Sequence, residues 1–155
     1  MGLDMYLEVR RYVSAYAHTS EENKKAFNEI VNTVGLQDAH DNRFGTVAVN
    51  VAYWRKANHI HHWFVQNVQD GEDDCGQYKV SRQQLIELEE LCRKVSKDGT
   101  AEEASKLLPT ADGFFFGTDE YDEYYFGDTD MTAKRLAHLL NVIPTEDEFF
   151  YQSSW

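Results

Sequence analysis

Apolar and polar residues alternate along the first ten residues of the chain. Leu3, Met5, Leu7 and Val9 occupy every second position, and a period of two is typical of a β-strand with one buried face. Other short runs are rich in β-branched or aromatic residues and also predict strands. These runs are 44–49, 78–80, the phenylalanine run 113–117 and the closing segment 149–155.

Start and stop signals predict the helices. Thr19-Ser20 followed by two glutamates begins one, and Gly35 ends it. Ser81 with Gln84 forms a capping box. We expect helices at 21–34, 51–68 with Asn50 as cap, 82–98, and 130–143 with Asp128 or Thr129 as cap and Pro144 as stop.

The intervening segments are predicted to be irregular. A polar loop covers 37–43 and includes His40, and a second loop, QDGEDDCG, covers 69–76. Residues 119–130 start with a helical turn and continue as a connection. Helices and strands roughly alternate, which predicts an α+β (mixed α/β) fold. We expect one domain over 1–155, with a small mixed β-sheet packed by three to four helices.

Charge and composition narrow the classes of partner. The 155 residues include 27 acids and 15 bases, a net charge of −12, with 42% hydrophobic and 14% aromatic residues. Such a chain has the composition of a globular protein and repels nucleic acids and anionic membranes. The acidity favours a basic partner, or serves solubility alone. There is no membrane-length apolar run and no signal peptide, so we expect a cytoplasmic protein with Cys75 and Cys92 reduced.

The segment YWRKANHIHHWF at 53–64 carries the densest chemistry. On a helix, one stripe faces the core, whereas His59 and His62 face water. The core stripe comprises Tyr53, Ala57, Ile60, Phe64 and Val68. Two roles stay open for the residues that flank this stripe. One is structural, with hydrogen bonds to a neighbouring loop. The other is a ligand cleft in which His61 moves a proton and Lys56 holds an anion. The cleft would be lined by Asp4, Trp54, Lys56, Asn58 and His61, with Tyr121 nearby.

The sequence gives little support for a metal site or a reactive cysteine. His59 and His62 lack a third ligand on their face, and the acids of 70–74 fail the spacing of a calcium loop. Cys75 lies among these acids, which disfavour a reactive thiolate. We therefore predict no catalytic residue, no metal and no cofactor.

The stretch 112–130 holds seven acids and seven aromatic residues but no Lys or Arg. Exposed rings provide contact area and carboxylates attract basic partners, so an exposed patch here would bind protein. The alternative is that these rings cover the end of the sheet. The predicted partner-binding residues are Asp119, Glu120, Tyr121, Asp122, Glu123, Tyr124 and Tyr125.

Five blocks of sequence resemble a family of uncharacterised small proteins encoded by bacteriophages and prophage-bearing bacteria. They are MGLDMYL, YWRKAN-x-IH-x-WF, QDG-x-DDC-x-x-Y-x-VS, LLPT-x-x-GFFFG with YDEYYF, and YQSSW. The resemblance spans essentially the whole chain, which leads us to expect a complete protein. It implies a phage accessory protein of the host cytoplasm, of the host-takeover or anti-defence kind, and it transfers no catalytic residues.

Three hypotheses follow. The first is a non-enzymatic inhibitor that binds a basic host protein, such as part of a nucleic-acid-handling defence complex, without binding nucleic acid or membrane. The second is a small enzyme or a small-ligand or nucleotide-binding domain that uses the cleft around Lys56. The third is a nucleic-acid mimic, which needs carboxylates at phosphate-like spacing.

Overall fold

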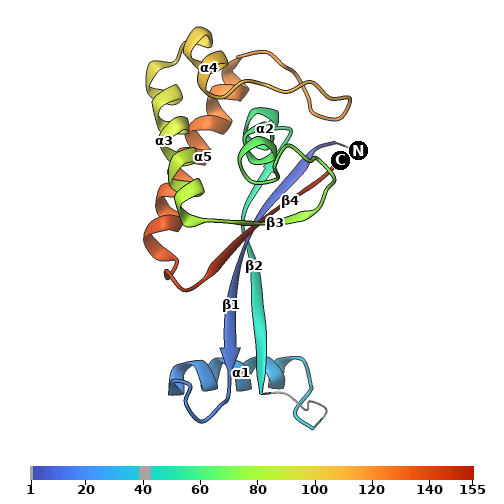
Figure 1. Ribbon diagram of the computed structural model, residues 1–155, viewed down its shortest axis with the longest axis vertical. Helices are drawn as coiled ribbons and strands as arrows, with labels where there is room; N and C mark the ends of the chain where they lie inside the picture. Colours follow the sequence, from blue (N-terminus) through green and yellow to red (C-terminus); the bar gives the residue numbers. More distant parts are fainter. Residues whose placement is uncertain (1, 39–42) are drawn as a thin grey trace. The chain divides into compact units, whose positions relative to one another are not determined.

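The computed structural model describes residues 2–38 and 43–155, so most of the predicted polar loop, including His40, lies outside the described residues. The described part forms five helices and four strands (Figure 1). In chain order they are β1 (Asp4–Ser14), α1 (Glu21–Thr33), β2 (Phe44–Arg55), α2 (Asn58–Asn67), β3 (Gln77–Val80), α3 (Arg82–Asp98), α4 (Ala101–Leu107), α5 (Glu123–Val142) and β4 (Glu148–Ser154). The α+β prediction is confirmed.

The chain divides into two compact units. The main unit consists of the residues up to Val9 together with Asn50–Trp155, and the hairpin unit is Arg10–Val49. β1 and β2 contribute residues to both units, whereas α1 belongs to the hairpin unit and every other element to the main unit.

The four strands form one antiparallel sheet in the order β2-β1-β4-β3. The last strand therefore lies between the first and the third, and Tyr151 of β4 stands opposite Tyr78 of β3. The predicted alternation holds, because Leu3, Met5 and Leu7 are buried whereas Asp4 and Tyr6 are not. One face of the main unit's sheet thus contributes to the core, and the opposite face carries polar residues.

Helices α3 and α5 lie side by side, with α4 near one end of the pair (Figure 1). The capping box of Ser81 and Gln84 starts α3 as predicted, and Gly99 ends it with φ 69°. A left-handed residue satisfies a terminal carbonyl at little steric cost when it is glycine. The buried side chains of α3, which packs against α5, belong to the core and are Leu85, Leu88, Cys92 and Val95.

Helix α4 and the start of α5 were not anticipated. Thr100 caps α4, which buries Ala104 alone, and a helix with so little apolar surface has no periodic signal. Helix α5 begins directly after Asp122, whose carboxylate accepts the N–H groups of Tyr124 and Tyr125. The prediction of Asp128 or Thr129 as cap was wrong, because Asp122 supplies the same capping chemistry earlier.

Two segments have different structures from those predicted. Residues 50–55 continue β2 rather than forming a helix, and Lys56, with φ 58°, ends the strand before α2 begins. Residues 113–117 form a turn instead of a strand. Its last residue, Gly117, packs against the Lys56 side chain. The φ angle of Gly117 is 90°, a backbone conformation that residues with a side chain rarely adopt.

No helix in the described ranges is both long and apolar enough to cross a lipid bilayer.

The packing of α3 against α5 can be tested by substitution at Leu88. Replacing the fully buried Leu88 with alanine leaves a cavity, so the free energy of unfolding should fall by about 2–5 kcal/mol. Urea denaturation followed by far-UV circular dichroism measures the change. The exposed Val142 of α5 offers a matched control, since Val142→Ala should change stability by less than ~0.5 kcal/mol. Equal effects of the two substitutions would contradict this packing.

Candidate functional site

Helix α2 is surrounded by protein on almost every side. Its buried residues include both apolar and polar side chains: Asn58, His59, Ile60, His61, Trp63, Phe64 and Val65. The prediction that His59 faces water was wrong, since its side chain is 3% exposed. The helix contacts β4, α5 and the loop 110–122 at once, and buried polar groups in such a position need internal hydrogen-bond partners.

His61 connects α2 to the end of the chain. Its Nδ1 lies 2.7 Å from the Tyr151 hydroxyl and its Nε2 lies 3.0 Å from Asp73 Oδ2. The indole of Trp155 donates to the other oxygen of Asp73 at 3.1 Å. Burial lowers the pKa of His61, and Asp73 opposes that shift. A neutral His61 that donates from Nε2 and accepts the Tyr151 hydroxyl satisfies every member of this network.

His59 connects α2 to α5. The Thr129 hydroxyl donates to the carbonyl of Tyr125, so His59 Nε2 donates to Thr129 Oγ1 at 3.0 Å. The imidazole also packs on the Tyr125 ring, with 4.1 Å between ring centroids. Burial lowers the pKa of His59 to about 3. His59 is therefore neutral at physiological pH.

Asn58 holds the loop 110–122 in place. Its Nδ2 donates to the carbonyls of Phe116 and Thr118 at 3.2 and 2.8 Å, and its Oδ1 accepts the N–H of Ala111. The carbonyl of Phe115 accepts the N–H of Leu3 at 3.0 Å. A segment without helix or strand hydrogen bonds is thus fixed at several backbone positions.

The predicted ligand cleft does not form. Trp54 is buried and donates from Nε1 to Thr132 Oγ1 at 2.8 Å, while Asn58 and His61 are buried in the networks above. Asp4 lies on the face of β1 opposite Leu3 and Met5, where it accepts a hydrogen bond from Tyr53. The strand alternation separates it from Trp54.

Lys56 and Asn58 instead line a small hollow together with residues of the predicted partner-binding patch. The hollow has a volume of about 40 Å³, and its acidic members include Glu120, Asp122 and Asp128. Burial raises the pKa of Asp128, and Asp122 adds to that shift. The two sets of residues that the sequence suggested as separate sites therefore meet here. The space has room for a few water molecules and is too small for an organic ligand.

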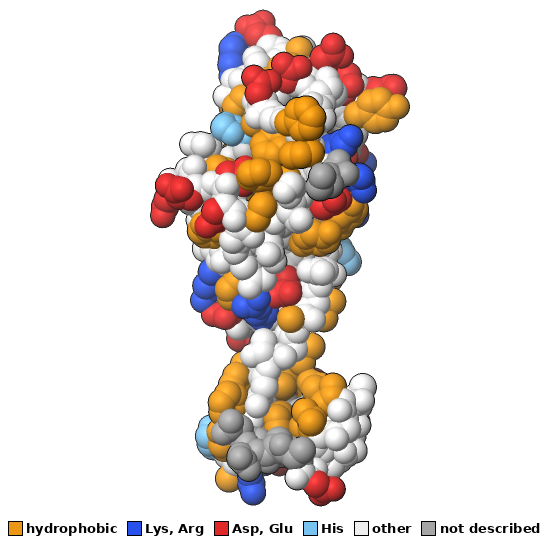
Figure 2. All heavy atoms as spheres, turned by 90° about the vertical axis from the view of Figure 1, so that its right-hand side faces the viewer, with side chains coloured by type: hydrophobic (Ala, Val, Ile, Leu, Met, Phe, Trp, Pro, Cys, Tyr) orange, Lys and Arg blue, Asp and Glu red, His pale blue; other side chains and the backbone are white. Residues whose placement is uncertain are grey.

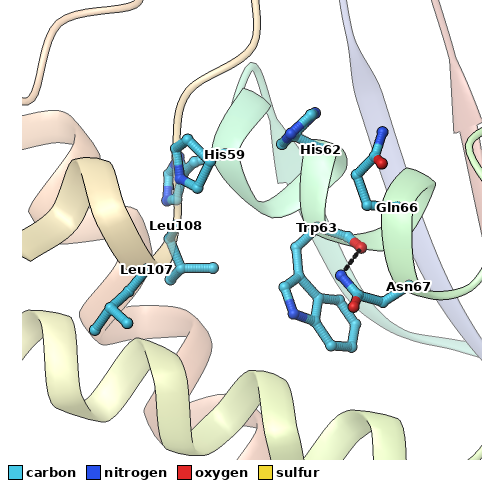
Figure 3. Close-up of a pocket in the computed structure, with 8 residues that line it drawn as sticks. His59, His62, Trp63, Gln66, Asn67, Leu107 and Leu108 are labelled. Atoms are coloured by element: carbon cyan, nitrogen blue, oxygen red, sulfur yellow. Dashed lines mark hydrogen bonds between the residues drawn. The ribbon is translucent and has the colours of Figure 1, made fainter.

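A second hollow, of about 150 Å³, lies between α2 and the segment that follows α4 (Figure 3). Trp63, Leu107, Leu108 and His59 supply its walls, and Asn67, which donates to the Trp63 carbonyl, lies at its side. His59 lines both hollows. The second hollow is apolar and the first is acidic, so together they offer adjacent pockets for unlike side chains.

Two aromatic rings of the segment 112–124 are exposed. Phe114 is 96% exposed, and Tyr124, which lines the acidic hollow, is 73% exposed. Figure 2 shows hydrophobic side chains next to carboxylates over this part of the main unit. We call the exposed set the ring-and-acid surface, and it comprises Asp112, Phe114, Asp119, Glu120, Glu123 and Tyr124.

The structure changes the membership of the predicted patch. Tyr125 is 4% exposed, and its hydroxyl donates to the Leu108 carbonyl at 2.7 Å. Tyr121 is half-buried, and its hydroxyl accepts the N–H of Thr110. Helix formation from residue 123 turns Tyr125 to the core and Tyr124 to water. Phe114 was missed, because three phenylalanines between glycines are typical of a buried strand.

The acidic loop at 70–76 has a structural explanation. Asp74 accepts hydrogen bonds from the Gly76 N–H and the Tyr78 hydroxyl, which lower its pKa. Asp73 bonds His61 and Trp155. Cys75 is half-buried with φ 58°, and Cys92 is buried with a raised pKa. Among residues 2–38 and 43–155, no three His, Cys, Asp or Glu side chains are grouped to hold a metal ion.

Comparisons of the chain with protein-family models, curated proteins and solved structures found no match.

Asn58→Ala tests the support of the loop. The substitution leaves two carbonyls and one N–H without their partner, which should lower stability by about 1–3 kcal/mol. Amide exchange of Ala111, whose N–H bonds to Asn58, should accelerate more than that of helical amides in α3. Asn67→Ala on the same helix is the control, because Asn67 Nδ2 bonds a carbonyl of α2 itself. Unchanged exchange at Ala111 would contradict the role given to Asn58.

The buried His59 predicts a dependence of stability on pH. Its folded-state pKa of about 3 lies below the ordinary value of 6.5, so the unfolded chain binds the proton more readily. Stability should be full above about pH 6.5. It should fall by up to ~1.4 kcal/mol per pH unit as the pH drops towards 3.

His59→Gln retains a donor for Thr129 and removes this titration. Urea midpoints of both proteins at several pH values between 7.5 and 4.5 isolate the His59 contribution, because the carboxylates are common to both. Parallel pH profiles for the two proteins would show that His59 does not titrate as proposed.

Proposed function

We propose that this chain is a binding protein that engages a basic partner protein through its ring-and-acid surface. The observation that carries the proposal is Phe114, almost fully exposed on a loop whose backbone is hydrogen-bonded to the buried Asn58 and to Leu3. An aromatic ring held in water costs free energy that a partner recovers by covering it. A fixed backbone also reduces the entropy lost when the partner binds.

The distribution of charge supports a basic partner. Residues 10–49 contain five basic and five acidic residues, so the net charge of −12 belongs entirely to the rest of the chain, which corresponds to the main unit. Four of its carboxylates, those of Asp112, Asp119, Glu120 and Glu123, belong to the ring-and-acid surface. Such a field accelerates association with a positively charged protein and weakens in salt.

The adjacent hollows suggest how a partner would be held. A lysine or arginine side chain of the partner would approach the acidic hollow around Glu120, Asp122 and Asp128, and an apolar side chain would enter the hollow formed by Trp63 and Leu108. Tyr124 lines the acidic hollow and is exposed, so its ring would contact both the partner and the hollow's rim. These contacts would supply the specificity that charge alone lacks.

The resemblance to bacteriophage-encoded small proteins supports a biological setting. In this setting the chain is a phage accessory protein of the bacterial cytoplasm and acts as an anti-defence inhibitor of a host factor. A defence complex that handles nucleic acid carries basic surfaces, and these are the chemistry that an acidic, ring-bearing surface would recognise.

The alternative, a small enzyme or a small-ligand or nucleotide-binding domain, has less support. Trp54, Asn58 and His61 are buried and hydrogen-bonded within the protein, so neither a substrate nor an anion held by Lys56 would reach them.

Capture from bacterial lysate tests the proposal. Tagged protein should retain a basic polypeptide at about 0.05 M NaCl and lose most of it at about 0.5 M. With the partner purified, Phe114→Ser and Tyr124→Ala should each weaken binding by about tenfold or more. Glu120→Lys with Glu123→Lys should slow association. Val142→Ser, an exposed apolar position of the same unit, serves as the control.

Two results would contradict the proposal. One is capture that is insensitive to salt and to the Phe114 substitution, because the partner would then bind elsewhere. The other is the absence of any specifically retained polypeptide under conditions where the control and the unmodified protein are both folded.

A further inference from the structure

A third hollow lies on the face of the main unit's sheet that is turned away from the core. Its volume is about 230 Å³, and every strand of the sheet contributes to its lining. The face of an antiparallel sheet that is not packed on the core can be covered by water alone. A concavity with side chains from four strands, however, offers a ligand contacts from several directions. The described residues that line it all belong to the main unit and are Tyr6, Glu8, Asn50, Gln77, Phe150 and Gln152.

Two aromatic rings form the apolar part of this hollow. Tyr6 and Phe150 are half-buried and come from the neighbouring strands β1 and β4. Tyr6 contacts Tyr53 of β2, with 5.4 Å between ring centroids, and the Tyr53 hydroxyl donates to Asp4 at 2.5 Å. The Tyr6 ring is therefore supported by its neighbour. A ring held in this way offers apolar surface and loses little side-chain entropy when a ligand covers it.

Three primary amides are spread across the hollow. Asn50 of β2 lies on one side of β1, whereas Gln152 of β4 and Gln77 of β3 lie on the other side and stand opposite each other in the register. All three side chains are exposed. Gln152 Nε2 donates to the carbonyl of Cys75 at 3.3 Å, which orients this amide. Because a primary amide has both a donor and an acceptor group, each can bond a hydroxyl in either sense.

The charges at the hollow favour a neutral ligand. Among the described residues that line it, Glu8 is the one charged side chain. Lys79 stands opposite Phe150 on the same face, and it forms an ion pair with Glu148. A phosphate or carboxylate in the hollow would thus meet the Glu8 carboxylate without a cation of the lining to offset it, within a main unit that already carries the net negative charge. Nucleotides and sugar phosphates are therefore disfavoured.

The size and hydrogen-bonding groups of the hollow decide between neutral ligands. It is smaller than the roughly 300–1,000 Å³ of pockets for drug-sized ligands, which leaves room for about one six-membered ring with its substituents. A nucleobase has donors and acceptors of fixed kind on its edges and binds by stacking its flat faces. A sugar ring has hydroxyl groups around its circumference, each of which donates and accepts, and its C–H groups suit the negative face of an aromatic ring. Amides on both sides of β1 match the sugar.

We propose that this hollow binds a neutral saccharide through one pyranose ring. The sugar ring lies against Tyr6 and Phe150, and its hydroxyl groups bond the amides of the rim. The Glu8 carboxylate, which has several acceptor positions, accepts a further hydroxyl. The site belongs to the polar face of the sheet and shares no residue with the ring-and-acid surface. Saccharide binding is thus a second activity, independent of the capture of a basic partner.

An NMR titration of the unmodified, isotope-labelled protein tests the proposal. The probes are methyl α-glucoside, methyl β-galactoside, methyl α-mannoside and N-acetylglucosamine, each added up to about 100 mM. At least one should shift the side-chain amide signals of Asn50, Gln77 and Gln152, with a dissociation constant on the order of 1–10 mM. Adenosine, uridine and glucose 1-phosphate serve as comparison ligands and should bind about tenfold more weakly or not at all.

Substitutions then locate the site. Tyr6→Leu removes the ring and Gln77→Ala removes one amide, and each should raise the dissociation constant of the bound glycoside by about fivefold or more. Gln83→Ala, at an exposed position of α3, is the matched control for Gln77. Phe114→Ser with Tyr124→Ala, the pair that tests partner capture, should leave glycoside binding unchanged.

Three results would overturn the proposal. One is the absence of shifts at the three rim amides with every glycoside, because at about 100 mM even a pyranose of the wrong configuration would occupy part of a site for this class. Another is a nucleoside or the sugar phosphate that binds more tightly than the glycosides. The third is glycoside binding that Tyr6→Leu and Gln77→Ala leave unchanged. The main readout uses the unmodified protein, so it does not depend on how the variants fold.

Discussion

The burial of helix α2 is the constraint on which the rest of the main unit depends. Apolar residues such as Ile60 and Phe64 favour burial of the helix, but the same turn-to-turn spacing carries Asn58, His59 and His61 inward with them. Leaving such polar groups unpaired would cost about 1–3 kcal/mol each. The surrounding elements are therefore positioned to bond them.

Each polar residue of α2 fixes a different neighbour. Asn58 determines the path of the loop 110–122, His59 determines how α5 lies against α2, and His61 fixes β4 and the acidic loop through Tyr151 and Asp73. Asn58, His59 and His61 are residue types that are common in active sites, but here their polar atoms hold the fold together. The exposed Phe114 and Tyr124, by contrast, make no comparable contribution to the core. This contrast is the physical basis for the proposal that Phe114 and Tyr124, rather than the histidines, contact a partner.

The two units divide the properties of the chain between them. The main unit has the large core and all of the net charge, while the hairpin unit is neutral and has little buried apolar surface. Charge steers association over distances of about 10 Å, whereas apolar contact acts only when surfaces meet.

The sequence by itself determined the features that depend on near neighbours. The alternation of Leu3, Met5 and Leu7 indicated β1, and the Ser81–Gln84 capping box and Gly99 bounded α3. The run of acids and rings at 112–130 was likewise visible in the sequence. Only the tertiary structure decided that 50–55 is a strand, that His59 and His61 are buried, that Tyr125 points inward and that Phe114 points outward. Caps and alternation act within a few residues of the chain. The burial of a ring or an imidazole depends on which distant segments surround it, and their hydrogen-bond partners lie between 12 and 90 residues away in the sequence.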